Sequence, residues 1–158
     1  MKAEQSIKTE KEMIFSRIVN APRELVFDVW TIREHVEKWW GPDGFTTTSK
    51  QFELKPEGVW LFTMHGPDGI DYPNKIVFME IDRPAKLVYR HSDDEGVEPV
   101  RFHSEVTFEE ENGKTLITMH MIMETAEMLT KVVEEYGAYE GAIQHLARMR
   151  DYLEALQS

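Results

Sequence analysis

The apolar stripe at the C-terminal end of the chain constrains the fold more than any other feature of the sequence. Its members are separated by four, three, four and three residues, which is the spacing of one face of an α-helix; they are Ala142, Leu146, Met149, Leu153 and Leu156. Tyr139 and Ile143 extend the same face. We therefore predict a C-terminal helix of about five turns, beginning between Val133 and Tyr139, whose apolar face is covered by the rest of the chain.

The middle of the chain has the pattern of consecutive antiparallel strands. Segments rich in β-favouring residues are separated by short turns, of which Asn112-Gly113 is the strongest hairpin signal. Two copies of Gly-Pro-Asp-Gly, at residues 41–44 and 66–69, are predicted as two independent turns, because proline presets φ and glycine accepts positive φ. The predicted strands cover residues 13–21, 45–54, 59–65, 72–81, 86–91, 100–110 and 115–124.

Two short helices are predicted between the first two strands. Pro22 suits the first turn of a helix, and Gly41-Pro42 ends the second one. Their apolar positions at helical spacing are Leu25, Val26, Val29, Trp30, Ile32, Val36, Trp39 and Trp40. Gly137 and Gly141 set residues 126–136 apart as a further short helical segment before the C-terminal helix.

This order of elements predicts an α+β fold, in which a curved antiparallel sheet of about seven strands wraps around the C-terminal helix. The length of 158 residues fits one domain better than two. Residues 1–12 are predicted as a flexible N-terminal arm and residues 13–158 as a single domain.

The composition excludes several classes of function. A net charge of −11 argues against nucleic acid and against anionic membrane surfaces, which both require clustered Lys and Arg. No apolar run approaches the roughly 20 residues of a membrane span, and the polar N-terminus lacks the apolar segment of a signal peptide. We therefore expect a cytoplasmic protein. The absence of cysteine removes disulfides, thiolate nucleophiles and thiolate metal sites.

Three stretches of the sequence resemble a known family. They read "RIVNAPRELVFDVWT…EHVEKWWGPDGF", "GVWLFTMHGPDG" and "YPNKIVFMEIDRPAKLVYRH", and the ending "YGAYEGAIQHLARMRDYL" is similar to the last helix of bacterial members. Over residues 13–156 the chain resembles the Aha-type family, the homologues of the activator of heat-shock protein 90 ATPase, in the START-like, Bet v 1-like (SRPBCC) superfamily. The resemblance implies a helix-grip fold, with space for a small hydrophobic ligand between the sheet and the C-terminal helix.

Two departures from the family pattern concern this space. Many relatives carry two glycines before the strand of Trp60, where this chain has Glu57-Gly58. Many also carry Gly-Trp in the last helix, where this chain has Gly141-Ala142. The second departure implies a cavity of different size beside Ala142.

The resemblance implies that one face of the sheet lines the ligand cavity. Methionine suits such a wall because it fills irregular space. The predicted lining residues are Trp30, Trp40, Trp60, Phe62, Met64, Phe78, Phe102, Met119, Met121, Ile143 and Leu146. Plain core packing is the alternative, since a large aromatic side chain buries roughly 150–250 Å² without any ligand. This alternative is the stronger one for Trp30, Trp39 and Trp40, which would dock the short helices.

The histidines form no metal-binding motif. They are His35, His65, His91, His103, His120 and His145, and none belongs to a His-Glu-x-x-His pair. His65, His103 and His120 come from three strands but alternate with the apolar face, so we predict solvent-exposed histidines.

No nucleophile, phosphate loop or cofactor motif is present, so the sequence favours a binding protein over an enzyme and implies no cofactor, metal or catalytic residue. Three functions stay open at this point: binding of a small hydrophobic molecule, regulation of a heat-shock protein 90 homologue as a co-chaperone, and a polyketide-cyclase-like reaction. The last would need polar groups within the cavity, and Glu53, Glu80 and Glu105 are the strand carboxylates available. The sequence specifies neither the ligand nor an oligomeric state.

Overall fold

A computed structural model describes residues 4–92 and 102–158 of the chain. Within these residues one antiparallel sheet contains eight strands in the order β1-β2-β8-β7-β6-β5-β4-β3. The strands are β1 (Gln5–Lys8), β2 (Glu12–Val19), β3 (Thr46–Phe52), β4 (Val59–His65), β5 (Asp71–Asp82), β6 (Lys86–Ser92), β7 (Phe102–Glu111) and β8 (Lys114–Met123). The predicted strands correspond to β2 through β8, and the additional strand is β1.

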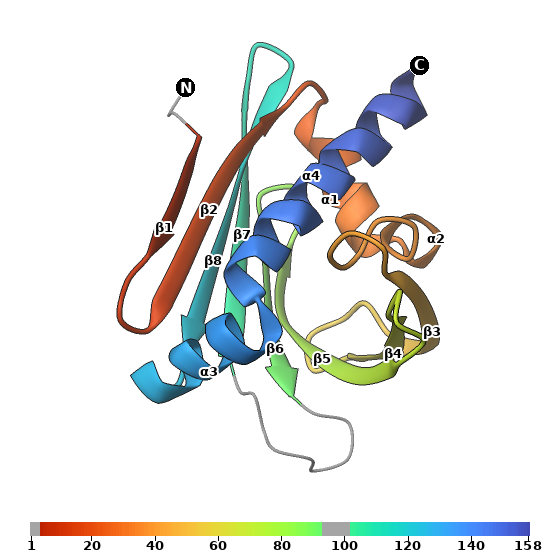
Figure 1. Cartoon of the computed structure of the whole chain (residues 1–158). Helices are drawn as coiled ribbons and strands as arrows, with labels where there is room; N and C mark the ends of the chain where they lie inside the picture. The colour runs from red at the N-terminus through yellow and green to blue at the C-terminus, as the bar shows by residue number, and fades with distance from the viewer. Residues whose placement is uncertain (1–3, 93–101) are drawn as a thin grey trace.

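Four helices accompany the sheet in the described residues. They are α1 (Arg23–Thr31), α2 (Arg33–Val36), α3 (Ala126–Tyr136) and α4 (Ala138–Gln157). The sheet curves around α4, which crosses its inner face, while α1 and α2 lie near one end of α4 and α3 near the other (Figure 1). The α+β class and the helix-grip arrangement are confirmed. Gly137 adopts φ 62°, a left-handed conformation that glycine tolerates, and this residue separates α3 from α4.

Alternating strand positions and the helical stripe together form the core. The buried strand residues include Trp60 and Phe62 on β4 and Val106 and Phe108 on β7. The stripe of α4 is buried at Ala142, Leu146, Met149 and Leu153. The last predicted member, Leu156, is 42% exposed because it lies one residue from the end of the helix, beyond its buried stretch.

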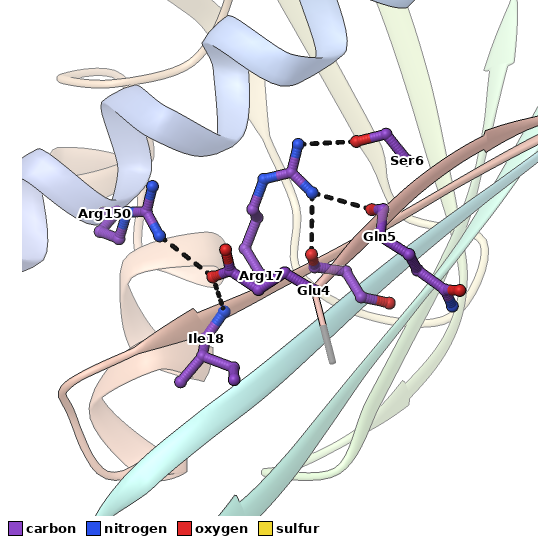
Figure 2. A network of polar contacts seen from close by, with 7 residues as sticks. Glu4, Gln5, Ser6, Arg17, Ile18 and Arg150 are labelled. Atoms are coloured by element: carbon purple, nitrogen blue, oxygen red, sulfur yellow. Dashed lines mark hydrogen bonds and ion pairs between the residues drawn. The ribbon is translucent and has the colours of Figure 1, made fainter. Parts of the chain in front are cut away.

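The prediction of a flexible arm is wrong for residues 5–8, which form β1 and pair with β2 from Gln5↔Ser16 to Lys8↔Met13. Figure 2 shows the polar contacts that hold this strand. Arg17 donates from Nη1 to the Gln5 carbonyl and from Nη2 to Ser6 Oγ, both at 2.8 Å. The Glu4 carboxylate accepts from the Ile18 backbone N–H at 2.7 Å and from Arg150 of α4 at 3.1 Å. The N-terminal strand is therefore joined to both the sheet and the helix.

The hairpin between β7 and β8 turns at Asn112 and Gly113 with φ values of 54° and 77°, as the Asn-Gly signal predicts. The two Gly-Pro-Asp-Gly turns are not independent of each other. A Cβ added at Gly44 would lie 3.2 Å from Cγ of Pro67, so the backbone of one turn packs against the proline of the other.

Candidate functional site

A cluster of three tryptophans and one histidine lies between α1, the α2 segment and α4. The ring of His145 lies 4.5 Å from that of Trp40, 4.9 Å from that of Trp39 and 5.8 Å from that of Trp30, measured between centroids. Trp39 donates its indole N–H to the Val29 carbonyl at 2.9 Å, and Trp30 donates to Sδ of Met149 at 2.8 Å. All four aromatic side chains are buried. The prediction that Trp30, Trp39 and Trp40 serve helix docking agrees with these contacts.

Hydrogen bonds from α4 fix the loop that follows Trp40. The Gly41 backbone N–H donates to Nδ1 of His145 at 2.9 Å. Arg148 donates from Nη1 to the carbonyls of Trp40, Gly41 and Pro42 and from Nη2 to that of Phe45, at 3.3, 3.0, 2.9 and 3.0 Å. Burial lowers the pKa of Arg148, and the Asp43 carboxylate opposes this shift. The first Gly-Pro-Asp-Gly turn is therefore held by two basic side chains one helical turn apart.

Trp40 connects this cluster to the sheet. Its ring lies 4.9 Å from Trp60 in an edge-to-face arrangement and 6.1 Å from Tyr89 of β6. Trp60 in turn stacks on Phe62 with centroids 4.0 Å apart and donates its N–H to Ser49 Oγ at 2.9 Å. The ring of Trp40 therefore lies between Trp60 of β4 and His145 of α4 and contacts both.

A row of side chains crosses the inner face of the sheet at the ends of β6, β7 and β8. In the strand register His91 lies opposite Phe102, and Phe102 lies opposite Met123. The His91 and Phe102 rings stack with centroids 4.2 Å apart and planes at 15°. The neighbouring row contains Tyr89 and Ser104, and the Tyr89 ring lies 5.6 Å from that of His91.

Two polar side chains of β6, the buried Tyr89 and the half-buried His91, therefore lie side by side on the inner face. Burial raises the pKa of Tyr89, and a hydrogen bond with Ser104 partly offsets the shift. Burial lowers the pKa of His91 to about 3, although part of the residue remains accessible. At neutral pH both side chains are uncharged, so they can donate and accept hydrogen bonds without carrying a charge.

A pocket of about 770 Å³ lies at this end of the sheet. Three of its lining residues belong to the inner-face row at the strand ends, namely His91, Phe102 and Met123. The others are Met79, Val88, Arg90, His103, Glu105, Ile122 and Glu124. Those on β6, β7 and β8 alternate with the inner-face row, so most of the pocket lies on the face of the sheet that points away from α4. Apolar surface with a few polar groups is typical of small-molecule sites, whose volumes are roughly 300–1,000 Å³.

Among the lining residues predicted from the sequence, Phe102 borders this pocket. Trp30 and Trp40 belong to the tryptophan cluster, and Trp60 stacks with Phe62. The remaining predicted residues are the buried Phe78, Met119 and Leu146 and the half-buried Met64, Met121 and Ile143, all of which pack in or against the core.

The prediction of solvent-exposed histidines is wrong for His145, which is 8% exposed, and for His91, which is half-buried. Burial lowers the pKa of His145 to about 3, and the charges of Arg148 and His91 act in the same direction. His145 lies three residues after Ala142 and four before Met149, so the helical stripe itself could have placed it inside. His91 follows Leu87 and Tyr89 at alternating positions, which could have placed it on the inner face.

Neither a metal site nor a membrane helix is present in the described part of the chain. No group of three or more His, Asp or Glu side chains there is arranged to hold a metal ion. None of the helices in residues 4–92 and 102–158 is long and apolar enough to cross a membrane.

Solved structures share this fold. A protein from Arthrobacter aurescens is 23% identical, with a TM-score of 0.89 over 96% of this chain and 91% of that one. A protein from Nitrosomonas europaea is 21% identical, with a TM-score of 0.82 over 96% and 99% of the two chains. A protein from Mycobacterium smegmatis is also 21% identical, with a TM-score of 0.81 over 98% and 96%.

Sequence comparison agrees with the resemblance. No curated protein matches the chain. The model of one family, described as "Activator of Hsp90 ATPase homolog 1-like protein", matches residues 20–154, which is most of the chain. The chain therefore belongs to the family of activator of Hsp90 ATPase homolog 1-like proteins.

Proposed function

We propose that this protein binds a small, predominantly apolar molecule in the pocket at the ends of β6, β7 and β8. The observation that carries the proposal is a pocket of about 770 Å³ whose lining combines Met79, Val88 and Ile122 with Phe102 and Met123 at the strand ends. Apolar surface that remains accessible in a pocket favours an apolar ligand, because covering it removes apolar area from water.

The chemistry of the lining supports the same conclusion. Met79, Val88, Ile122 and Met123 provide flexible or aliphatic surface in the pocket. Methionine adapts to ligands of different shape. The charged residues Arg90, Glu105 and Glu124 also line the pocket, and such groups orient a ligand more than they add to its affinity.

The lining predicted from the sequence is a separate proposal on the opposite face of the sheet, toward α4. There Phe102 is the shared residue, and Met119, Met121 and Phe78 would form the sheet side of a cavity, with Ile143 and Leu146 on the helix side. These side chains pack in or against the core, so a ligand between them requires movement of α4, whereas a ligand on the face away from α4 does not.

The test is a titration with 1-aminoanthracene, an uncharged apolar dye whose fluorescence rises when it leaves water. We expect saturable binding to the wild-type protein and at least a tenfold weaker affinity for Phe102→Ala. The matched control is Phe45→Ala, because Phe45 is also half-buried and contacts one other aromatic ring, that of Tyr72 at 5.8 Å. Equal loss of binding in both variants, or no saturable binding to wild type, would contradict the proposal.

The co-chaperone alternative rests on the family description, which names Hsp90. Isothermal titration calorimetry with a purified Hsp90 homologue would measure chaperone binding separately from ligand binding. Binding that survives Phe102→Ala, in a protein that takes up no dye, would favour the chaperone function over the ligand function.

A further inference from the structure

The two Gly-Pro-Asp-Gly turns and the residues that follow them present apolar side chains to solvent. Ile70 is 52% exposed and Tyr72 is 36% exposed. The Tyr72 ring lies 5.8 Å from that of the half-buried Phe45. Pro67, in the second turn, is exposed and packs against Gly44 of the first. These four side chains, Phe45, Pro67, Ile70 and Tyr72, form what we call the turn patch.

Hydrogen bonds hold the backbone of the turn patch in place. The Ile70 backbone N–H donates to Oδ1 of Asp68 at 3.0 Å, and the Ile70 carbonyl accepts from the Gly66 N–H at 2.9 Å. The Tyr72 hydroxyl donates to the Asp68 carboxylate at 3.4 Å. The first turn is held by hydrogen bonds from α4. A surface that is already ordered loses little conformational entropy when a partner binds, which favours docking at this place.

The turn patch lies among exposed carboxylates. Residues 41–45 and 66–72 contain Asp43, Asp68 and Asp71, all exposed, but neither Lys nor Arg. Asp71 contacts His65 at 2.7 Å, whereas Asp43 and Asp68 form no ion pair within residues 4–92 and 102–158. The charge of Asp43 acts on Arg148, but Arg148 donates its N–H groups to carbonyls of the loop. Two carboxylates beside the turn patch are therefore available to a cationic partner.

This combination of apolar surface and negative charge favours one kind of partner. The carboxylates repel an anionic membrane surface. They also repel a second copy of this chain, which carries the same net charge of −11. A basic protein segment is attracted by the charge, and apolar side chains on that segment remove the surface of Ile70 and Tyr72 from water.

We propose that the turn patch is a docking surface for a basic segment of another protein, in which Lys or Arg side chains are interspersed with aliphatic or aromatic ones. The apolar side chains of the segment cover Ile70 and Tyr72, and its cations pair with Asp43 and Asp68. This inference goes beyond the proposed ligand-binding function and is independent of it, because the turn patch shares no residue with the pocket.

The test compares three rhodamine-labelled peptides of equal length, made of repeated Lys-Leu-Gly, Lys-Ser-Gly or Glu-Leu-Gly. Fluorescence anisotropy measures their affinities. We expect saturable binding of the Lys-Leu-Gly peptide to the wild-type protein, weakened by added salt because the ion pairs are exposed. The Lys-Ser-Gly peptide keeps the charge but lacks the apolar side chains, so it should bind at least about fivefold more weakly. The Glu-Leu-Gly peptide should not bind.

Two pairs of variants assign the binding to the turn patch. Ile70→Ser should bind the Lys-Leu-Gly peptide at least about fivefold more weakly. Leu54→Ser is its matched control, since Leu54 is 40% exposed but follows β3 at the end of the β3–β4 hairpin remote from the turn patch. Asp68→Asn keeps an oxygen that can accept from the Ile70 N–H and should weaken binding about two- to threefold through the lost charge. Glu109→Gln removes an exposed charge near the other end of the sheet and should bind like wild type.

Amide NMR shifts of the wild-type protein locate the peptide without any variant. The Lys-Leu-Gly peptide should shift the amides of residues 43–45 and 66–72, and shifts confined to other residues overturn the proposal. Equal affinities of wild type and Ile70→Ser, or of the Lys-Leu-Gly and Lys-Ser-Gly peptides, overturn it as well.

Two further measurements test the other occupants of this surface. Sedimentation velocity detects a second copy of the chain, and flotation with phosphatidylcholine vesicles detects a lipid surface. Self-association or vesicle binding that is lost in Ile70→Ser overturns the proposal, because the turn patch would then serve one of those occupants. Binding of 1-aminoanthracene should be the same in Ile70→Ser and in wild type, so the docking surface and the pocket stand or fall separately.

Discussion

The Gly41 backbone N–H donates a hydrogen bond of 2.9 Å to Nδ1 of His145, so the start of the first Gly-Pro-Asp-Gly turn is held by a buried side chain of α4. Because Nδ1 accepts this bond, the neutral ring carries its proton on Nε2. The same turn accepts hydrogen bonds from Arg148. A turn that the sequence predicts from its local chemistry is therefore also fixed by a distant helix.

Replacing His145 by phenylalanine should destabilise the fold by about 1–3 kcal/mol, because the Gly41 N–H is left without its acceptor in a buried site. The matched control is Gln144→Ala, since the neighbouring Gln144 accepts from Asp43 of the same loop at 3.1 Å but in an exposed position. We expect the control to cost less than about 0.5 kcal/mol. Urea denaturation measures the free energy of unfolding of both variants. Similar losses of stability in the two variants would contradict this role of His145.

Stability should fall as pH decreases from 6.5 toward 5. The unfolded imidazoles of His91 and His145 have pKa values near 6.5, whereas burial lowers the folded values to about 3. Below pH 6.5 the unfolded chain therefore binds protons that the folded protein does not, and the free energy of unfolding decreases. Arg148 lies near His145 and opposes its charging in the folded state.

The size of this effect identifies the groups responsible. Each histidine contributes a slope of up to about 1.4 kcal/mol per pH unit. Urea denaturation at pH 6.5, 5.75 and 5 should show a smaller slope in His91→Phe than in wild type. An unchanged slope in His91→Phe would show that His91 is free to charge in the folded protein.

Most of the fold follows from local sequence signals. Turn residues delimit β2 through β8, and the apolar stripe predicts α4. β1 could not be predicted in this way because its residues, Gln-Ser-Ile-Lys, have no alternating apolar pattern. It pairs with residues 13–16 of β2 in a hairpin, and the side-chain contacts that add to this pairing come from Arg17 and, through Glu4 just before the strand, from Arg150 of α4. A strand held by backbone pairing and by side chains of other elements leaves little trace in its own sequence.

The site was less predictable than the fold. Alternation with Leu87 and Tyr89 could have placed His91 on the inner face. The pocket is lined mainly by strand positions that alternate with the core positions, such as Val88, His103 and Ile122, whereas the family resemblance implied a cavity on the core side of the sheet. Phe102 was predicted, because it faces the same side as the core positions of β7.

Arg148→Lys should destabilise the loop of residues 41–45, because an ammonium group cannot reproduce the planar fork that contacts four carbonyls. We expect a loss of about 1–3 kcal/mol and faster hydrogen exchange in this loop. Arg150→Lys is the control two residues away, since Arg150 makes an exposed ion pair with Glu4, of a kind worth about 0–1 kcal/mol. Equal effects of the two variants would show that the carbonyl contacts contribute little.

Glu4→Gln should loosen β1 without unfolding the protein. The change weakens both the hydrogen bond from Ile18 and the ion pair with Arg150, which are partly exposed (Figure 2). We expect a global loss below about 1 kcal/mol and a clear rise in exchange of the β1 amides. Glu10→Gln provides the control, because Glu10 lies in the exposed turn between β1 and β2. Unchanged exchange in Glu4→Gln would mean that backbone pairing with β2 is sufficient.

The last prediction concerns Glu57 and Gly58, where the family resemblance implies a pair of glycines. Glu57 adopts φ 69°, a left-handed conformation that costs a residue with a Cβ about 1 kcal/mol or more. Glycine at this position relieves that cost but adds freedom to the unfolded chain. We therefore expect Glu57→Gly to raise the free energy of unfolding by up to about 1 kcal/mol, or the melting temperature by roughly 2–4 °C.

Gly58 is the opposite case. A Cβ added there would lie 2.2 Å from the Glu53 carbonyl oxygen and 2.8 Å from that of Lys55, and both are backbone atoms that cannot move aside easily. The Gly58 carbonyl also accepts from the Phe78 N–H at 2.9 Å, so a shift of this residue would disturb β5. Gly58→Ala should therefore lose at least about 3 kcal/mol. Differential scanning calorimetry of both variants checks the pair, and a stable Gly58→Ala protein would show that the turn before β4 can open without disturbing the sheet.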